Sequence, residues 1–81
     1  MRITIKAFAS VKDSLGFSER RLDLSSGTTA EGAVRAVERE LGVGIPDFDS
    51  LLFAVNEEYC RRDRVLREND VLALFPPVSG G

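Results

Sequence analysis

The chain has 81 residues, of which 43% are hydrophobic and 30% are charged, and its formal net charge is −2. This length allows one domain with a small core, and the composition is that of a soluble globular protein. The balanced charge does not favour nucleic-acid binding, and the longest apolar run, over residues 71–78, is far shorter than the roughly 20 residues of a membrane span.

The first half of the chain begins with two predicted strands that flank a short helix. Over residues 2–9, isoleucine and alanine alternate with polar residues, which is the period of a strand. Phe8 falls on the otherwise polar face of that strand. A short helix follows, with Ser10 as its N-cap and Gly16 as its end. Residues 19–24 form the second predicted strand, and their many charges indicate an edge position.

The strongest helix signal begins at Thr28. Thr28 and Glu31 have the spacing of a capping box, and apolar residues then recur at helical intervals until Gly42. We expect Glu31 to pair with Arg35 one turn later, because residues four apart on a helix are neighbours. Glu38 is expected on the same solvent-exposed face.

The second half predicts three more strands. They cover residues 51–56, the short segment 59–60 and the apolar segment 71–75. In the charged connection between the last two, Val65 or Leu66 is expected to enter the core. Strands on both sides of one long helix predict an α+β, β-grasp (ubiquitin-like) fold: a mixed sheet of four to five strands, with the main helix packed on one face.

The last strand runs directly into a tail with a distinctive composition. We divide the chain into a domain, residues 1–75, and an extended flexible tail, residues 76–81, that ends in Gly-Gly. Proline ends the hydrogen-bond ladder of a strand, and glycine allows close approach to another surface. We therefore expect the tail to thread through a narrow passage with the carboxylate of Gly81 at its end; the threading residues are Pro76, Pro77, Val78, Ser79 and Gly80.

The remaining residues offer little chemistry of their own. The chain has no histidine and one cysteine, which excludes histidine-based catalysis and a four-cysteine zinc site. It also lacks a phosphate-binding loop motif. The acidic pairs in the loops are interpreted as solvated, and Cys60 as a partly buried structural residue. We therefore predict no bound metal, no bound cofactor and no enzyme activity by the chain alone. The single cysteine and the absence of an apolar signal-peptide core predict a cytoplasmic protein.

The string Phe-Pro-Pro-Val-Ser-Gly-Gly over residues 75–81 resembles the small subunit of molybdopterin synthase, a ubiquitin-like sulfur carrier family. Residues 52–56 and 66–75 extend the resemblance. Asn69 stands where that family often has glycine, and asparagine tolerates the same left-handed turn. The resemblance also implies that the first and last strands lie parallel and adjacent in the centre of the sheet.

The resemblance implies a function for the terminal carboxylate. An adenylating enzyme of the ubiquitin-activating type would use ATP to activate Gly81, and a sulfur nucleophile would then convert it to a thiocarboxylate. The large subunit of molybdopterin synthase would accept the tail, and sulfur would pass to a cyclic pyranopterin precursor of the molybdenum cofactor. ATP belongs to the activating partner in this scheme, because this chain has no nucleotide motif.

A docking surface is expected at the base of the tail. If the first and last strands are neighbours, Phe8, Val71 and Phe75 share the sheet face that points away from the helix. Clustered exposed apolar residues are typical of interaction sites, so we predict that these three residues, here called the docking patch, bind a partner.

Three other functions remain open on the sequence. The chain could carry sulfur for another pathway, such as thiamine thiazole synthesis or tRNA thiolation, although the proline pair is unusual for thiazole carriers. It could be a ubiquitin-like modifier that is joined to lysines through Gly81. It could also be a plain interaction domain, which would not require a free C-terminus.

Overall fold

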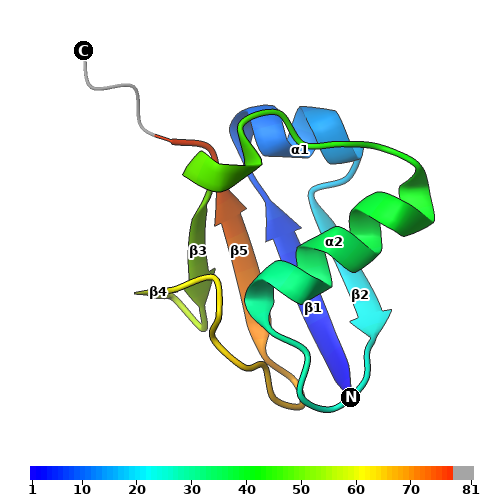
Figure 1. The fold of residues 1–81 in the computed structure, drawn as a ribbon, viewed down its shortest axis with the longest axis vertical. Coiled ribbons are helices and arrows are strands. Elements are labelled where there is room, and N and C mark those ends of the chain that lie inside the picture. The colour runs from blue at the N-terminus through cyan, green and yellow to red at the C-terminus, as the bar shows by residue number, and fades with distance from the viewer. Residues whose placement is uncertain (78–81) are drawn as a thin grey trace.

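The computed structural model describes residues 1–77 and consists of a five-stranded mixed sheet, one face of which is crossed by the longer helix (Figure 1). The shorter helix covers one end of the sheet, near the point where the chain leaves its last strand. The elements follow in the order β1 (Arg2–Ala7), α1 (Ala9–Leu15), β2 (Glu19–Asp23), α2 (Ala30–Leu41), the 3-10 helix η1 (Phe48–Ser50), β3 (Leu52–Val55), β4 (Glu58–Cys60) and β5 (Val71–Phe75).

The sheet has the strand order β2-β1-β5-β3-β4. The first and last strands, β1 and β5, are parallel and occupy its centre, with Ile5 opposite Leu72. All the other strand pairs are antiparallel. This arrangement confirms the β-grasp fold, the central parallel pair and the edge position of β2.

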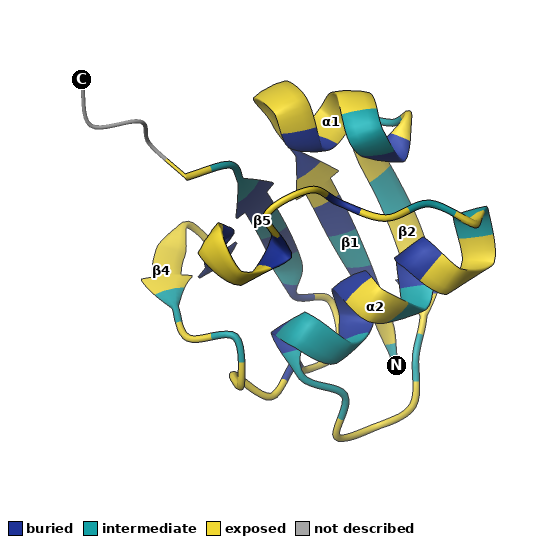
Figure 2. Ribbon diagram, turned by 45° about the horizontal axis from the view of Figure 1, so that its top comes forward, coloured by how far each residue is buried: buried dark blue, intermediate teal, exposed yellow. Residues whose placement is uncertain are grey.

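The core lies between the sheet and α2. Alternate residues of β1 and β5 point towards the helix, which contributes small and β-branched side chains that are also fully buried (Figure 2). The main members are Ile3, Ile5, Leu72 and Leu74 from the sheet and Ala30, Ala33, Val34 and Val37 from α2. Leu66 is 2% exposed and Val65 is 51% exposed, so Leu66 is the residue of the connection that enters the core.

The first strand is shorter than predicted, and the start of α1 differs from the expectation. β1 ends at Ala7, and the N-cap of α1 is Phe8, whose side chain makes no capping hydrogen bond. The prediction of Ser10 as N-cap was wrong, because the carbonyl of Phe8 already accepts the N–H groups of Val11 and Lys12. Gly16 ends the helix with a φ of 82°, as predicted.

The start of α2 is shifted by one residue from the predicted capping box. Thr29 is the N-cap, and its Oγ1 accepts a hydrogen bond of 3.1 Å from the N–H of Gly32. The hydroxyl of Thr28 instead donates to the carbonyl of Ser25 at 2.7 Å, so the preceding turn uses it. The end of the helix at Gly42 was predicted correctly.

The acidic residues of α2 make other contacts than expected. Glu38 is only 7% exposed; it forms an ion pair with Arg35 at 2.9 Å and accepts a 2.8 Å hydrogen bond from the N–H of Ile45. The expected pair of Glu31 with Arg35 does not form, and Glu31 lies 3.6 Å from Arg62 instead. Arg35 pairs with Glu38 instead of Glu31, and the other carboxylate oxygen of Glu38 binds the loop that follows α2. Glu38 therefore anchors this loop against the last turn of the helix.

Two turns require left-handed backbone. Asn56 and Glu57, between β3 and β4, both have positive φ, as the tightest hairpin turns require. Asn69, before β5, has a φ of 68°, which confirms the left-handed turn expected there. None of the described helices is long and apolar enough to cross a membrane.

Candidate functional site

The strand register brings the docking patch together on the sheet face away from α2, here called the open face. Phe75 follows Ala73 on this face of β5, and the backbone N–H of Phe8 donates to the carbonyl of Leu74 at 3.3 Å. This bond holds Phe8 beside the end of β5 although it lies just beyond β1. The residues predicted to share a face therefore do so.

Three aromatic rings form the centre of this surface. The rings of Phe8 and Phe75 are stacked, with centroids 4.8 Å apart and planes only 8° from parallel. The ring of Tyr59 lies 6.1 Å from that of Phe75. Phe8 is 41% exposed and Tyr59 is 73% exposed, so much of this aromatic area faces solvent. Such rings are common anchors of protein interfaces.

Tyr59 is a functional candidate that the sequence analysis did not include. It lies on β4, opposite Ala54 of β3, and Ala54 lies opposite Ala73 of β5. Because the side chains of these two alanines are short, the surface is hollowed between Tyr59 and the stacked phenylalanines. Only the strand pairing places Tyr59 on the open face, since a three-residue strand has no clear periodicity of its own.

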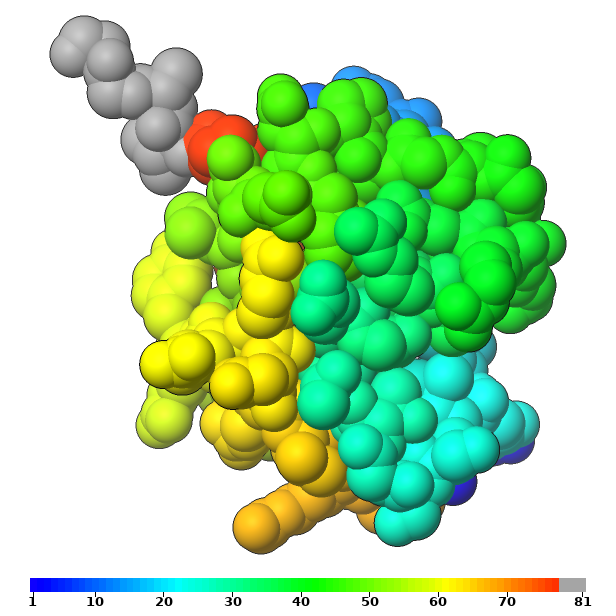
Figure 3. All heavy atoms as spheres, viewed as in Figure 1, coloured from blue at the N-terminus to red at the C-terminus, as the bar shows by residue number. Residues whose placement is uncertain are grey.

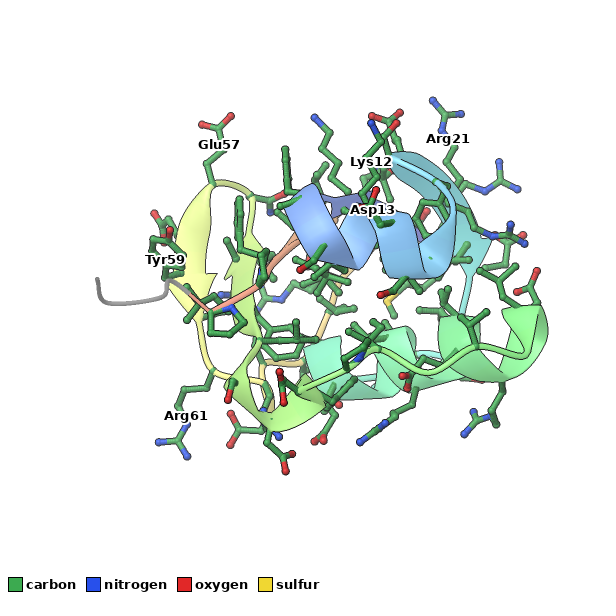
Figure 4. The ribbon with its side chains drawn as sticks, turned by 90° about the horizontal axis from the view of Figure 1, so that it is seen from above. Lys12, Asp13, Arg21, Glu57, Tyr59 and Arg61 are labelled. Carbon is green, nitrogen blue, oxygen red and sulfur yellow. The ribbon has the colours of Figure 1, made fainter. Side chains whose placement is uncertain are left out.

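The aromatic residues border a hollow of about 560 Å³ on the open face. Its floor includes Ala54 and Ala73, and its rim carries Lys6 on one side and Glu57 on the other. Figure 4 shows Glu57 and Tyr59 on the β3–β4 hairpin at one side of the sheet, with Arg21 of β2 at the other. The surface thus combines an apolar centre with a charged rim, which is the usual anatomy of a protein interface.

A buried carboxylate fixes the start of β5, where Val71 begins the docking patch. Asp70 accepts hydrogen bonds from the side-chain amide of Asn56 at 2.9 Å and from the N–H of Arg67 at 2.7 Å. Asn56 in turn accepts from the N–H of Val71 at 3.0 Å. These bonds tie the β3–β4 turn to β5, so the two sides of the hollow are held in register.

A second hollow lies beside the end of β5, on the side of α1. It measures about 310 Å³ and is here called the tail-root groove, because Pro76 and Pro77 form one of its walls. Figure 3 shows these prolines in red against the green atoms of the segment around η1. The structure therefore places the first two tail residues in the wall of this groove, directly after Phe75, which lines the open-face hollow. Val78, Ser79, Gly80 and Gly81 lie outside the described residues.

The other polar candidates of the described residues are Cys60 and the loop acids. Burial raises the pKa of the Cys60 thiol, an effect that Arg64 partly opposes. The loop acids are exposed, as expected, and Asp49 pairs with Arg62 at 3.2 Å. Within residues 1–77, no group of three or more histidine, cysteine or acidic side chains is placed to hold a metal ion.

Comparison with known proteins identifies relatives over the whole chain. The model of the ThiS family matches residues 5–81. A molybdopterin synthase sulfur carrier subunit of Chlamydomonas reinhardtii is 31% identical over 87 residues, covering 100% of both chains. The protein of the same name in Dictyostelium discoideum is 34% identical over 80 residues, covering 95% of this chain and 93% of its own.

Solved structures share the fold. SAMP1 from Haloferax volcanii matches with a TM-score of 0.80 at 25% identity, and covers 100% of both chains. A chain in the complex of subunits 1 and 2 of the molybdopterin-converting factor from Helicobacter pylori matches with a TM-score of 0.65 at 22% identity, again over 100% of both chains. The resemblance inferred from residues 75–81 is confirmed, and the chain belongs to the ThiS family.

Proposed function

We propose that this chain is a sulfur carrier and forms the small subunit of a molybdopterin synthase in the cytoplasm. The observation that carries the proposal is the stacked aromatic docking patch at the point where the Gly-Gly tail leaves the sheet. Curated relatives that match most or all of the chain bear the name of this subunit. The role of one subunit in a two-subunit synthase also agrees with the prediction that the chain is no enzyme by itself.

The proposed chemistry takes place at the carboxylate of Gly81. A carboxylate oxygen attacks the α-phosphate of ATP on a separate adenylating enzyme of the ubiquitin-activating type, and pyrophosphate leaves. As the sulfur nucleophile we take a persulfide on a donor protein, which attacks the carbonyl carbon of the acyl adenylate and displaces AMP, giving an acyl disulfide. A thiol of the donor then attacks the donor-side sulfur of that disulfide, so that the thiocarboxylate leaves and a disulfide remains on the donor. The thiocarboxylate sulfur is a stronger nucleophile than the original oxygen, so it can attack a cyclic pyranopterin precursor.

The docking patch is the surface through which the chain would bind its partner in this scheme. We propose that Phe8, Val71 and Phe75, with Tyr59 beside them, bind the large synthase subunit, while the tail enters its active site. The exposed ring of Phe8 and the half-buried ring of Phe75 are stacked and present a continuous apolar area, and burial of such rings typically dominates interface energy. Pro76 and Pro77 then direct the tail away from the sheet.

Intact-protein mass spectrometry tests the proposal. The chain is produced with an untagged C-terminus in cells that contain its partners and is captured through an N-terminal tag. We expect a fraction whose mass has increased by the exchange of one oxygen for sulfur, together with co-purified large subunit. A chain with one extra alanine after Gly81 is the control and should show neither the mass change nor sulfur transfer. Loading of this control would contradict the proposal.

The likeness to a solved modifier supports a second candidate function. SAMP1 from Haloferax volcanii has the same fold at a TM-score of 0.80, and a second structure of it bears the name small archaeal modifier protein 1. Conjugation through Gly81 would join the whole chain to a lysine of another protein. The mass of the product separates the two functions: sulfur loading changes the chain by one atom, whereas conjugation adds the chain to its target.

A further inference from the structure

The tail-root groove has an apolar floor and a polar rim. Val11 of α1, Ile45 of the loop after α2 and Leu51 after η1 are all buried and line it. Ser10 and Ser14, four residues apart on one face of α1, form part of the rim together with Asp47. The groove is thus assembled from three segments that meet only in the folded chain.

The loop that forms one side of this groove is firmly held. The carboxylate of Glu38 accepts the N–H of Ile45 at 2.8 Å, and Arg35, which pairs with the same carboxylate, lies over the ring of Phe48 at 3.5 Å. Asp47 has a φ of 55°, so its backbone adopts the left-handed conformation between these two anchors. The groove therefore has a defined shape before any partner binds.

The length of the tail requires a partner to come close to this groove. Four residues separate Pro77 from the end of the chain, and at about 3.3–3.6 Å each they reach at most about 14 Å. An active site that encloses Gly81 must therefore open within this distance of the groove. A site that encloses the whole tail brings its rim to the tail root, where the tail-root groove lies beside Pro76 and Pro77.

We propose that the tail-root groove is a second docking surface, which receives an extended segment from the rim of the partner's tail-accepting site. This inference rests on the proposed function, and it adds a contact that shares no residue with the docking patch. The segment has one apolar side chain over Val11, Ile45 and Leu51, and one basic side chain next to Asp47. The basic group is favoured because the Asp47 carboxylate is exposed and makes no salt bridge within the part of the chain that the structure describes.

The direct test fills the groove and measures binding. Ser10 is exposed at the start of α1, so Ser10→Trp places a large ring over the groove without removing a core contact. Asp13→Trp is the matched control, because Asp13 is also exposed on α1 and lines neither hollow (Figure 4). Full-length variants are titrated into the purified partner subunit by calorimetry. We expect Ser10→Trp to weaken binding at least tenfold and Asp13→Trp to leave it within about twofold of the unmodified chain.

A second variant tests the charge without changing shape. Asp47→Asn keeps a residue that tolerates positive φ and removes the carboxylate. We expect it to weaken binding by roughly threefold at low salt, as for a partly exposed ion pair, with the difference lost at 1 M salt. Asp13→Asn is its control and should have no effect. Urea unfolding of all four variants establishes that each is folded in the binding assay.

Several results would overturn this inference and leave the proposed function intact. Normal binding of folded Ser10→Trp, while Phe75→Ala still weakens binding, would show that the partner contacts only the open face. Tighter binding or faster transfer by Ser10→Trp would show that the groove instead holds the chain's own tail. A failure of the unmodified chain to bind any tail-accepting partner would count against the proposed function itself.

Discussion

Replacement of Phe75 by alanine should separate a docking role from a folding role. Phe75 is partly buried and touches two other rings, Phe8 at 4.8 Å and Tyr59 at 6.1 Å between centroids. An aromatic pair contributes about 0.5–1.5 kcal/mol beyond its buried area, so we expect Phe75→Ala to lower the free energy of unfolding by about 1–2 kcal/mol. A domain of this size retains enough stability to stay folded after such a loss.

Phe75→Ala should change the free energy of partner binding by at least as much as it changes the free energy of unfolding. Truncation of a central aromatic residue in an interface typically costs 2 kcal/mol or more, and 1.4 kcal/mol corresponds to a factor of ten in the dissociation constant. We therefore expect Phe75→Ala to weaken binding of the large subunit at least tenfold. Phe8→Ala should weaken binding similarly with a smaller loss of stability, because Phe8 is the more exposed ring of the pair.

Both quantities are measured on the same samples, by urea unfolding and by calorimetric titration under conditions where each variant is folded. Val65→Ala is the control, since Val65 is an exposed apolar residue outside the docking patch. If the phenylalanine variants lose stability but bind normally when folded, the two rings serve the fold and the proposed docking patch is wrong.

Four further outcomes are expected. Deletion of Gly81 should abolish sulfur transfer and leave the unfolding temperature almost unchanged, as measured by mass spectrometry and calorimetry. Gly80→Val should slow loading or transfer far more than Ser79→Ala, because a β-branched side chain widens the tail and disfavours positive φ; equal rates would exclude a tight passage. Asp70→Ala should lower the free energy of unfolding by about 1–3 kcal/mol, because the Asn56 amide and the Arg67 N–H both lose their acceptor, the buried Asp70 carboxylate; unchanged urea unfolding would contradict this. Cys60 should react with iodoacetamide at neutral pH more slowly than free cysteine, with a rate that rises as the pH approaches its raised pKa; an equal or faster rate would be contrary to this.

The parts of the structure that follow from local patterns could be predicted from the sequence. The alternation of Ile3 and Ile5 indicated the buried face of β1, and Asn69 indicated the left-handed turn before β5. The cap of α2 was misplaced because Thr28 and Thr29 are equally suitable residues. What decides between them is the carbonyl of Ser25, which lies within reach of the Thr28 hydroxyl in the folded turn.

The candidate site required contacts between distant segments. Phe8 and Phe75 could be placed on one face because the family resemblance supplied the pairing of β1 with β5. Tyr59 could not be placed, since its position depends on the register of β4 against β3. The tail-root groove was also absent from the sequence analysis, because its loop is positioned by the hydrogen bond between Glu38 and Ile45, which leaves no periodic pattern.

The central position of β5 affects how the protein is made in the cell. β1 pairs with β5, so the centre of the sheet cannot form until the ribosome has translated the final strand. A chain that is released before residue 71 therefore has no strand to pair with the inner edge of β1. Such a fragment exposes Ile3 and Ile5 and is a target for chaperones and proteases. We therefore expect a chain that ends before β5 to be degraded faster than the full chain, so that folding itself selects molecules that carry the last strand and the segment after it.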